Sequence, residues 1–124
     1  MTWYAAHIVI RIMPIQEPPE AILVYENVVL VEAPSEADAL GKAKIIGQTE
    51  TALQDSLTLS GVPAKRVFAG VRKLITISNP ETSGLDQDRP SNGTEITYSV
   101  CKVSNAEELK KFAEGLEVSV KYIE

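Results

Sequence analysis

The chain has 124 residues, 44% of them hydrophobic and 23% charged, which fits one domain with a hydrophobic core and excludes a disordered protein. Its net charge of −5 argues against binding to nucleic-acid backbones and to anionic membranes, and is compatible with a basic protein partner. Cys101 is the single cysteine, so an internal disulfide framework is excluded. Because neither a signal peptide nor a membrane-spanning stretch is recognisable, we expect a cytoplasmic protein.

Two stretches near the N-terminus have the patterns of β-strands. Apolar residues alternate along 3–13, with His7 on the face opposite the isoleucines. Residues 22–33 are rich in β-branched side chains and predict a second strand, with an irregularity expected at Glu26. The proline-rich connector 14–19 between them indicates a hairpin.

A helix and a third strand follow. Ser35 with Asp38 three residues later has the pattern of a helix N-cap. Small and apolar residues recur at helical spacing as far as Gly47, so we expect this helix to pack closely on a sheet. Residues 66–77 alternate and predict a third long strand, in which Gly70 indicates a bulge or a close backbone approach.

The second half of the chain begins with a polar stretch. Residues 78–93 contain two prolines and two glycines, which predicts a flexible loop within the domain. Residues 94–103 alternate and predict a strand. Ser104 or Asn105 then caps a second helix, and 116–122 form a last alternating strand.

These elements predict an α+β fold in one domain, residues 1–124. The succession of a strand, a serine cap and a helix occurs once at Ser35 and again at Ser104, which indicates two similar halves. The order is β-β-α-β-β-α-β, and without its first strand it matches the ferredoxin-like split β-α-β arrangement. We therefore expect an antiparallel sheet with the helices on one face and the other face open. The first strand is expected to extend an edge of this sheet or to pair with a partner chain.

The residues that most often carry chemistry show no motif here. His7 has no metal-ligand spacing to another ligand residue and is interpreted as a sheet-face histidine without a role. Cys101 is interpreted as inert packing. The basic segment 65–73 has only a weak likeness to an RNA-binding strand, and the loop 86–91 lacks the donors of a calcium site. The sequence predicts no catalytic, cofactor-binding or metal-binding residue, and no cofactor.

Several short motifs together indicate a family. Trp3-Tyr4 opens the first strand, Glu26 precedes a run of valine and leucine from Val28 to Val31, and Asn92-Gly93-Thr94-Glu95-Ile96 enters a late strand. Over residues 3–103 the chain resembles the small bacterial domain-of-unknown-function family numbered 4288. The resemblance implies no established activity. It singles out Glu26 and Glu95, which serve either in recognition or in pairing across the sheet with Arg11, Arg66 or Arg72.

The fold and composition favour a non-enzymatic protein-interaction or accessory module that self-associates as a homo-oligomer, without nucleic-acid or membrane partners. One alternative is an acidic immunity-type protein that neutralises a basic toxin. Another is a small carboxylate-dependent enzyme that uses Glu26 and Glu95. The candidate interaction residues are Trp3, Tyr4, Glu26, Phe68, Arg72 and Glu95.

Overall fold

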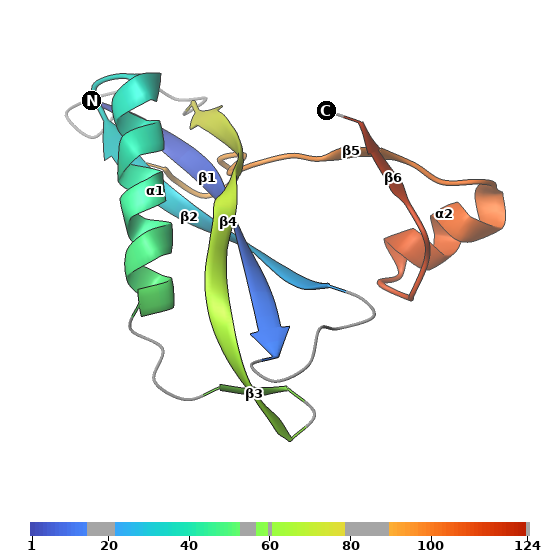
Figure 1. Ribbon diagram of the computed structural model, residues 1–124. Helices are drawn as coiled ribbons and strands as arrows, with labels where there is room; N and C mark the ends of the chain where they lie inside the picture. The colour runs from blue at the N-terminus through green and yellow to red at the C-terminus, as the bar shows by residue number, and fades with distance from the viewer. Residues whose placement is uncertain (15–21, 53–56, 60, 79–89, 124) are drawn as a thin grey trace.

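The computed structural model describes residues 1–14, 22–52, 57–59, 61–78 and 90–123 and shows an α+β fold (Figure 1). The described strands form a four-stranded sheet in the order β2-β1-β4-β3 and a separate two-stranded sheet of β5 and β6, with all pairs antiparallel. The elements are β1 (Thr2–Pro14), β2 (Leu23–Ala33), α1 (Glu36–Ala52), β3 (Leu57–Leu59), β4 (Val62–Ile77), β5 (Val100–Lys102), α2 (Ala106–Ala113) and β6 (Lys121–Ile123).

Strand β1 is the centre of the large sheet, because it pairs with β2 on one side and β4 on the other. The pairing with β2 runs without interruption from Thr2↔Ala33 to Ile12↔Leu23. The predicted strands at 3–13, 22–33 and 66–77 are therefore confirmed. The irregularity expected at Glu26 is absent, since the register does not shift there.

Helix α1 covers one face of this sheet and buries the apolar set of β1 beneath it. Tyr4 and Ala6 pack with Ala39 and Ala43 of α1. Farther along β1, Ile8 and Ile10 are the largest fully buried side chains and pack with Phe68 of β4. Because α1 presents alanine and glycine to the sheet, it can approach closely, as its sequence predicts.

Both helices have side-chain caps. The Asp38 amide donates to Ser35 Oγ at 3.2 Å, which confirms the first cap. In α2 the cap is Asn105, whose Oδ1 accepts from the Glu108 amide at 2.9 Å. Ser104 therefore does not take this role, and the serine half-repeat does not extend to the second cap. Helix α2 ends at Ala113, and Gly115, two residues later, adopts a φ of 78° in a Schellman-type turn.

Strand β4 contains two bulges where it pairs with β1. The register shifts between Val9 and Ile10, next to Gly70 with its φ of 156°, which confirms the irregularity predicted at that glycine. A second shift lies between His7 and Ile8, where Lys73 pairs with His7 and Val71 with Ile8. A bulge inserts one extra residue opposite the partner strand, and that residue is Arg72.

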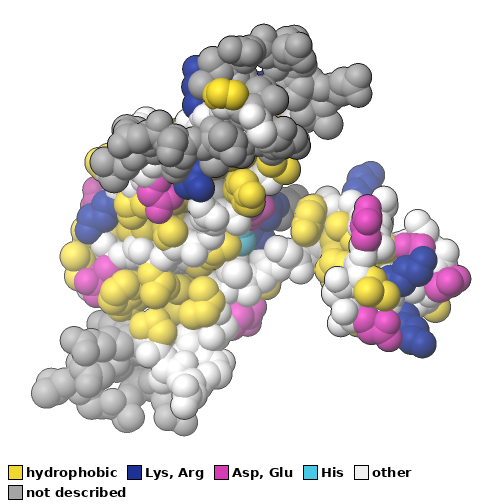
Figure 2. All heavy atoms as spheres, turned by 90° about the horizontal axis from the view of Figure 1, so that it is seen from below, with side chains coloured by type: hydrophobic (Ala, Val, Ile, Leu, Met, Phe, Trp, Pro, Cys, Tyr) yellow, Lys and Arg dark blue, Asp and Glu magenta, His cyan; other side chains and the backbone are white. Residues whose placement is uncertain are grey.

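The last part of the chain forms a small C-terminal unit, residues 100–123, from β5, α2 and β6. None of its residues falls in the buried class, and Leu109, Phe112 and Leu116 are all exposed. Figure 2 shows it as a lobe beside the main body. Helix formation and hairpin pairing are each marginal at this length, so the unit depends on contacts outside itself.

The ferredoxin-like strand order is not confirmed, and some strand predictions differ from the structure. The first strand is central in the sheet, not at an edge. Of the predicted strand 94–103, only Val100–Lys102 is a strand. The residues before it bond the side chains of His7 and Lys73 instead of pairing with the backbone of another strand. Most of the predicted loop 78–93 lies outside the described residues. Within the described residues, no helix is long and apolar enough to cross a membrane.

Two glycines of α1 give a matched test of how closely the helix packs on the sheet. A Cβ at Gly47 would lie 2.5 Å from two ring carbons of Phe68, whereas a Cβ at Gly41 would meet nothing within 4 Å. We expect Gly47→Ala to lower the free energy of unfolding by about 1–2 kcal/mol, because overpacking outweighs the gain in helix propensity. Gly41→Ala should raise it by about 0.5–1 kcal/mol. Urea unfolding measures both, and equal effects at the two sites would contradict the close approach.

Candidate functional site

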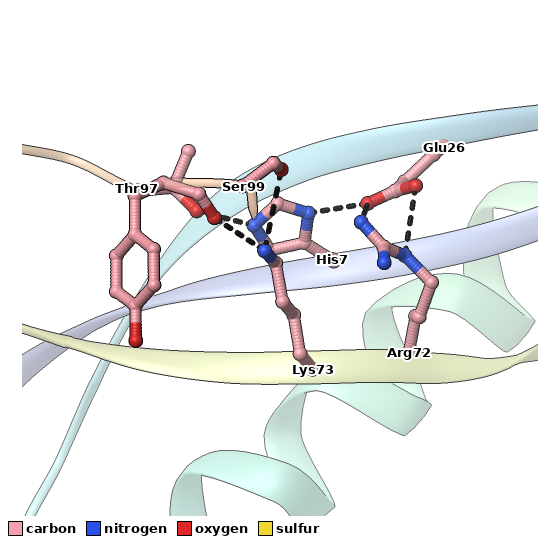
Figure 3. A network of polar contacts seen from close by, with 7 residues as sticks. His7, Glu26, Arg72, Lys73, Thr97 and Ser99 are labelled. Atoms are coloured by element: carbon pink, nitrogen blue, oxygen red, sulfur yellow. Dashed lines mark hydrogen bonds and ion pairs between the residues drawn. The ribbon is translucent and has the colours of Figure 1, made fainter. Parts of the chain in front are cut away.

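Three neighbouring strands bring polar side chains together on the sheet face opposite α1. His7 alternates away from the isoleucines of β1 and pairs with Val28, so Glu26, two residues along β2, lies on the same face. The bulge in β4 allows the consecutive residues Arg72 and Lys73 to reach this face together (Figure 3). We call these four residues and Thr97 the His7 network.

The imidazole ring of His7 is held at both of its nitrogens. Nδ1 bonds Glu26 Oε1, and Nε2 bonds Thr97 Oγ1 at 2.5 Å. The residue is only 3% exposed. Because an ionised carboxylate can only accept, Nδ1 carries a proton, and in the neutral ring Nε2 then accepts from the threonine hydroxyl. The Glu26 carboxylate thus fixes the tautomer of His7, and the Thr97 hydroxyl donates a hydrogen bond to the basic nitrogen, Nε2.

Arg72 fixes the carboxylate of Glu26. Its Nε donates to Oε2 at 3.0 Å and its Nη2 to Oε1 at 2.7 Å, which is a bidentate pair. The Arg72 hydrogen bonds hold the pKa of Glu26 below its ordinary value; partial burial works in the opposite direction, and the His7 bond adds to the lowering. Glu26 is therefore ionised at neutral pH and available to accept from His7.

Lys73 ties the chain after Thr97 to the same face. Its ammonium group donates to the carbonyl of Tyr98 and, at 3.3 Å, to Ser99 Oγ. The same group lies 5.4 Å from the centre of the Tyr98 ring. Thr97, the residue before Tyr98, bonds His7. The segment therefore covers His7 and occupies part of the sheet face that was expected to be open.

Shallow hollows flank the network on this face of the sheet. One, of about 310 Å³, is lined by Val9, Gly70, Val71 and Arg72, together with Ala69. Another, of about 170 Å³, lies between the end of β4 and the segment that carries Thr97, and its lining comprises Ile75, Thr76, Ser78, Glu95 and Tyr98.

The network has the composition of a hydrogen-bonded relay and not that of a metal centre. The described part of the chain contains no group of three or more histidine, cysteine, aspartate or glutamate side chains that could hold a metal ion. A histidine between a carboxylate and a hydroxyl is instead the arrangement in which a general base is oriented toward a nucleophile.

The structure places the six candidate interaction residues in different surroundings. Glu26 and Arg72 meet in the network, which confirms one of the pairings considered for Glu26. Glu95 is exposed and lines the smaller hollow. Tyr4 is buried in the core, and Phe68 is half-buried and packs against it.

Trp3, the sixth candidate, is half-buried, and its buried Nε1 has no hydrogen-bond partner within the described residues. Thr97 was not singled out from the sequence, and His7 was interpreted as a sheet-face histidine without a role; the structure gives both ring nitrogens of His7 a hydrogen-bond partner. The predicted pairing of the first two strands could have revealed a partner for His7, because it places the carboxylate of Glu26 diagonally across from the histidine.

The comparison with protein families decides the membership of the chain. The model of the domain of unknown function DUF4288 matches residues 3–97. The chain belongs to the DUF4288 family. All five residues of the His7 network lie inside the part that matches DUF4288, whereas the C-terminal unit lies beyond it. No curated protein and no solved structure matches the chain.

The lowered pKa of Glu26 predicts how stability depends on pH. The charge of Glu26 stabilises the folded state above its ordinary pKa of 4.5, and this contribution is lost as the pH falls through the lowered folded-state value. We expect Glu26→Gln to reduce the free energy of unfolding at neutral pH by about 1–2 kcal/mol, and the difference from wild type to shrink in acid. Urea unfolding from about pH 7 to about pH 3 measures this.

Glu95→Gln is the charge-matched control, because Glu95 is exposed and outside the network. If the two variants show the same dependence on pH, the ion pair of Glu26 with Arg72 does not stabilise the fold.

Proposed function

We propose that this DUF4288 protein is a protein-interaction module that self-associates through the outer edge of β2. The observation that carries the proposal is the state of that edge. Strand β2 has eleven residues and stands at the end of the sheet order, so only its inner side pairs within the described residues. Its exposed large hydrophobic residues are Leu23, Val24, Tyr25, Val28 and Leu30.

Strand β2 lacks the features by which proteins prevent edge strands from pairing. Natural edges carry lysine, proline or bulges, or are kept short. β2 contains no lysine, arginine, proline or glycine, and its register with β1 is unbroken. Its two charged residues are Glu32 and Glu26, and Glu26 is neutralised by Arg72. An edge of this kind is suited to pairing with another strand.

A groove beside the edge offers room for the side chains of that strand. It measures about 350 Å³ and lies between β2 and α1, with a lining of Leu30, Val31, Glu32, Lys42, Ile45 and Ile46. Lys42 donates to the carbonyl of Glu32 at 2.7 Å, which occupies one backbone acceptor near the end of β2. Pairing is therefore favoured along the rest of the strand.

The partner that fits best is a second copy of the chain. Two β2 edges can pair antiparallel about a two-fold axis, and the same apolar residues then face each other in both copies. The two four-stranded sheets become one continuous sheet, and the exposed side chains of β2 pack beside those of the other copy. Burial of several large apolar residues on each side supplies the main driving force.

Substitution of Leu30 by lysine tests the proposed edge. Leu30 is 48% exposed, so the change leaves the core intact. We expect wild type to sediment as a dimer at micromolar concentration and Leu30→Lys to sediment as a 13.5 kDa monomer, because a lysine on an edge strand opposes pairing and its charge would have to leave water at the contact. Sedimentation equilibrium measures both, and urea midpoints verify that the variant is folded.

Leu109→Lys in α2 is the matched control, since Leu109 is also an exposed leucine, at 55%, but lies in the C-terminal unit. It should leave the dimer intact. A monomeric wild type across the concentration range would refute self-association. A dimer that Leu109→Lys dissociates and Leu30→Lys does not would move the interface from β2 to α2.

A further inference from the structure

We propose that Thr97 is a histidine-activated nucleophile that accepts an acyl group from a small activated ester. The inference is independent of self-association. It rests on the order of groups in the His7 network, in which a hydroxyl, the two nitrogens of a buried imidazole and a carboxylate are linked in series. A nucleophile bonded to a base, and the base bonded to an orienting group, is the arrangement that activates serine and threonine hydroxyls.

His7 has the geometry of the base. Its Nε2 lies 2.5 Å from Thr97 Oγ1, within reach of the proton that the hydroxyl would lose. Its Nδ1 proton is directed to Glu26, so the ring cannot turn without breaking that bond. When the ring accepts the proton of Thr97, the carboxylate stabilises the resulting imidazolium.

Glu26 and Arg72 are positioning residues in this arrangement. The bidentate pair fixes the plane of the carboxylate from the side of β4, while the bond to His7 uses the Oε1 atom that Nη2 of Arg72 also reaches. A buried histidine with a purely structural role would need only a hydrogen-bond partner for each ring nitrogen. Here the carboxylate itself is held in one orientation, which preorganises the base.

Positive charge lies beside the two residues that follow Thr97. The ammonium group of Lys73 is bonded to the residues that directly follow Thr97, through the carbonyl of Tyr98 and the hydroxyl of Ser99. Figure 3 shows it between the His7 ring and the segment that carries Thr97. A cation in this position favours the negative charge that develops on a carbonyl oxygen under attack.

The size of the adjacent hollow limits the substrate. The hollow lined by Glu95 and Tyr98, two residues before and one residue after Thr97, measures about 170 Å³, enough for a short acyl group and too small for a large one. Thr97 also lies on a segment without regular secondary structure, held against a rigid sheet. Such segments commonly carry reactive groups.

The step is a simple acyl transfer. Thr97 Oγ attacks the carbonyl carbon of the ester while His7 Nε2 takes the hydroxyl proton, and the tetrahedral intermediate expels the alcohol. The imidazolium gives its proton to the departing alkoxide, or to solvent when the alcohol is acidic. An ester bond to Thr97 has formed and the bond to the alcohol has broken, with no change in oxidation state.

The probe is 4-nitrophenyl acetate with the full chain. We expect release of 4-nitrophenolate above the buffer rate, and one acetyl group located on Thr97 by peptide mass spectrometry. Thr97→Val should lower the release at least about tenfold, and Thr97→Ser should retain it. Thr51→Val is the matched control, because this threonine lies on α1 and its hydroxyl bonds the carbonyls of Gly47 and Gln48. It should react like wild type.

His7→Gln keeps a hydrogen-bonding side chain in the network but removes the base, so a folded His7→Gln protein should lose the reaction as Thr97→Val does. Should this variant fail to fold, the pair of Thr97 variants decides the question alone. Equal release from wild type and Thr97→Val, acetyl groups confined to lysines, or no release above buffer would each overturn the proposal. The oligomeric state of β2 variants does not bear on any of these results.

Discussion

The antiparallel pairing of β1 with both β2 and β4 is the constraint on which the rest of the structure depends. Because side chains alternate along a strand, this one pairing decides both faces of the sheet. The isoleucines of β1 turn toward α1 and form the core, and His7 turns the other way. Every contact of the His7 network follows from that choice, since Glu26 and Lys73 come from the strands on either side.

The energetic cost of a buried polar ring explains why a segment without regular structure lies over His7. A buried nitrogen without a hydrogen-bond partner costs about 1–3 kcal/mol. Glu26 satisfies one nitrogen from the sheet itself, but no strand supplies a partner for the other. Thr97 does so from the chain that follows the sheet. The path of residues 94–99 is thus set by side-chain bonds to His7 and Lys73, and not by a backbone ladder.

The sequence predicted the elements whose patterns are local, and the reasons for the failures are physical. Alternation located the first three long strands, and Ser35 with Asp38 located the start of α1. The register of the first two strands could also have been predicted. Pairing Met13 with Ile22 and counting back places His7 opposite Val28 and diagonal to Glu26, as observed. What alternation cannot supply is strand order, which requires knowledge of distant partners. Residues 94–99 also alternate, yet their partners are side chains of β1 and β4, so the pattern there was misleading.

Arg72 and Lys73, the cations of the His7 network, also contact aromatic rings in or next to the C-terminal unit, and these contacts connect that unit to the large sheet. Arg72 lies 5.3 Å from the centre of the Tyr122 ring of β6, while Lys73 contacts the ring of Tyr98 just before β5. A unit without buried residues gains little stability from its own packing, so these cation–π contacts weigh heavily in its position. The part that matches DUF4288 ends at residue 97, next to these contacts. The His7 network therefore lies where the part that matches DUF4288 meets the C-terminal unit, and a change in the pairing of Glu26 with Arg72 would affect the contacts of Arg72 on both sides.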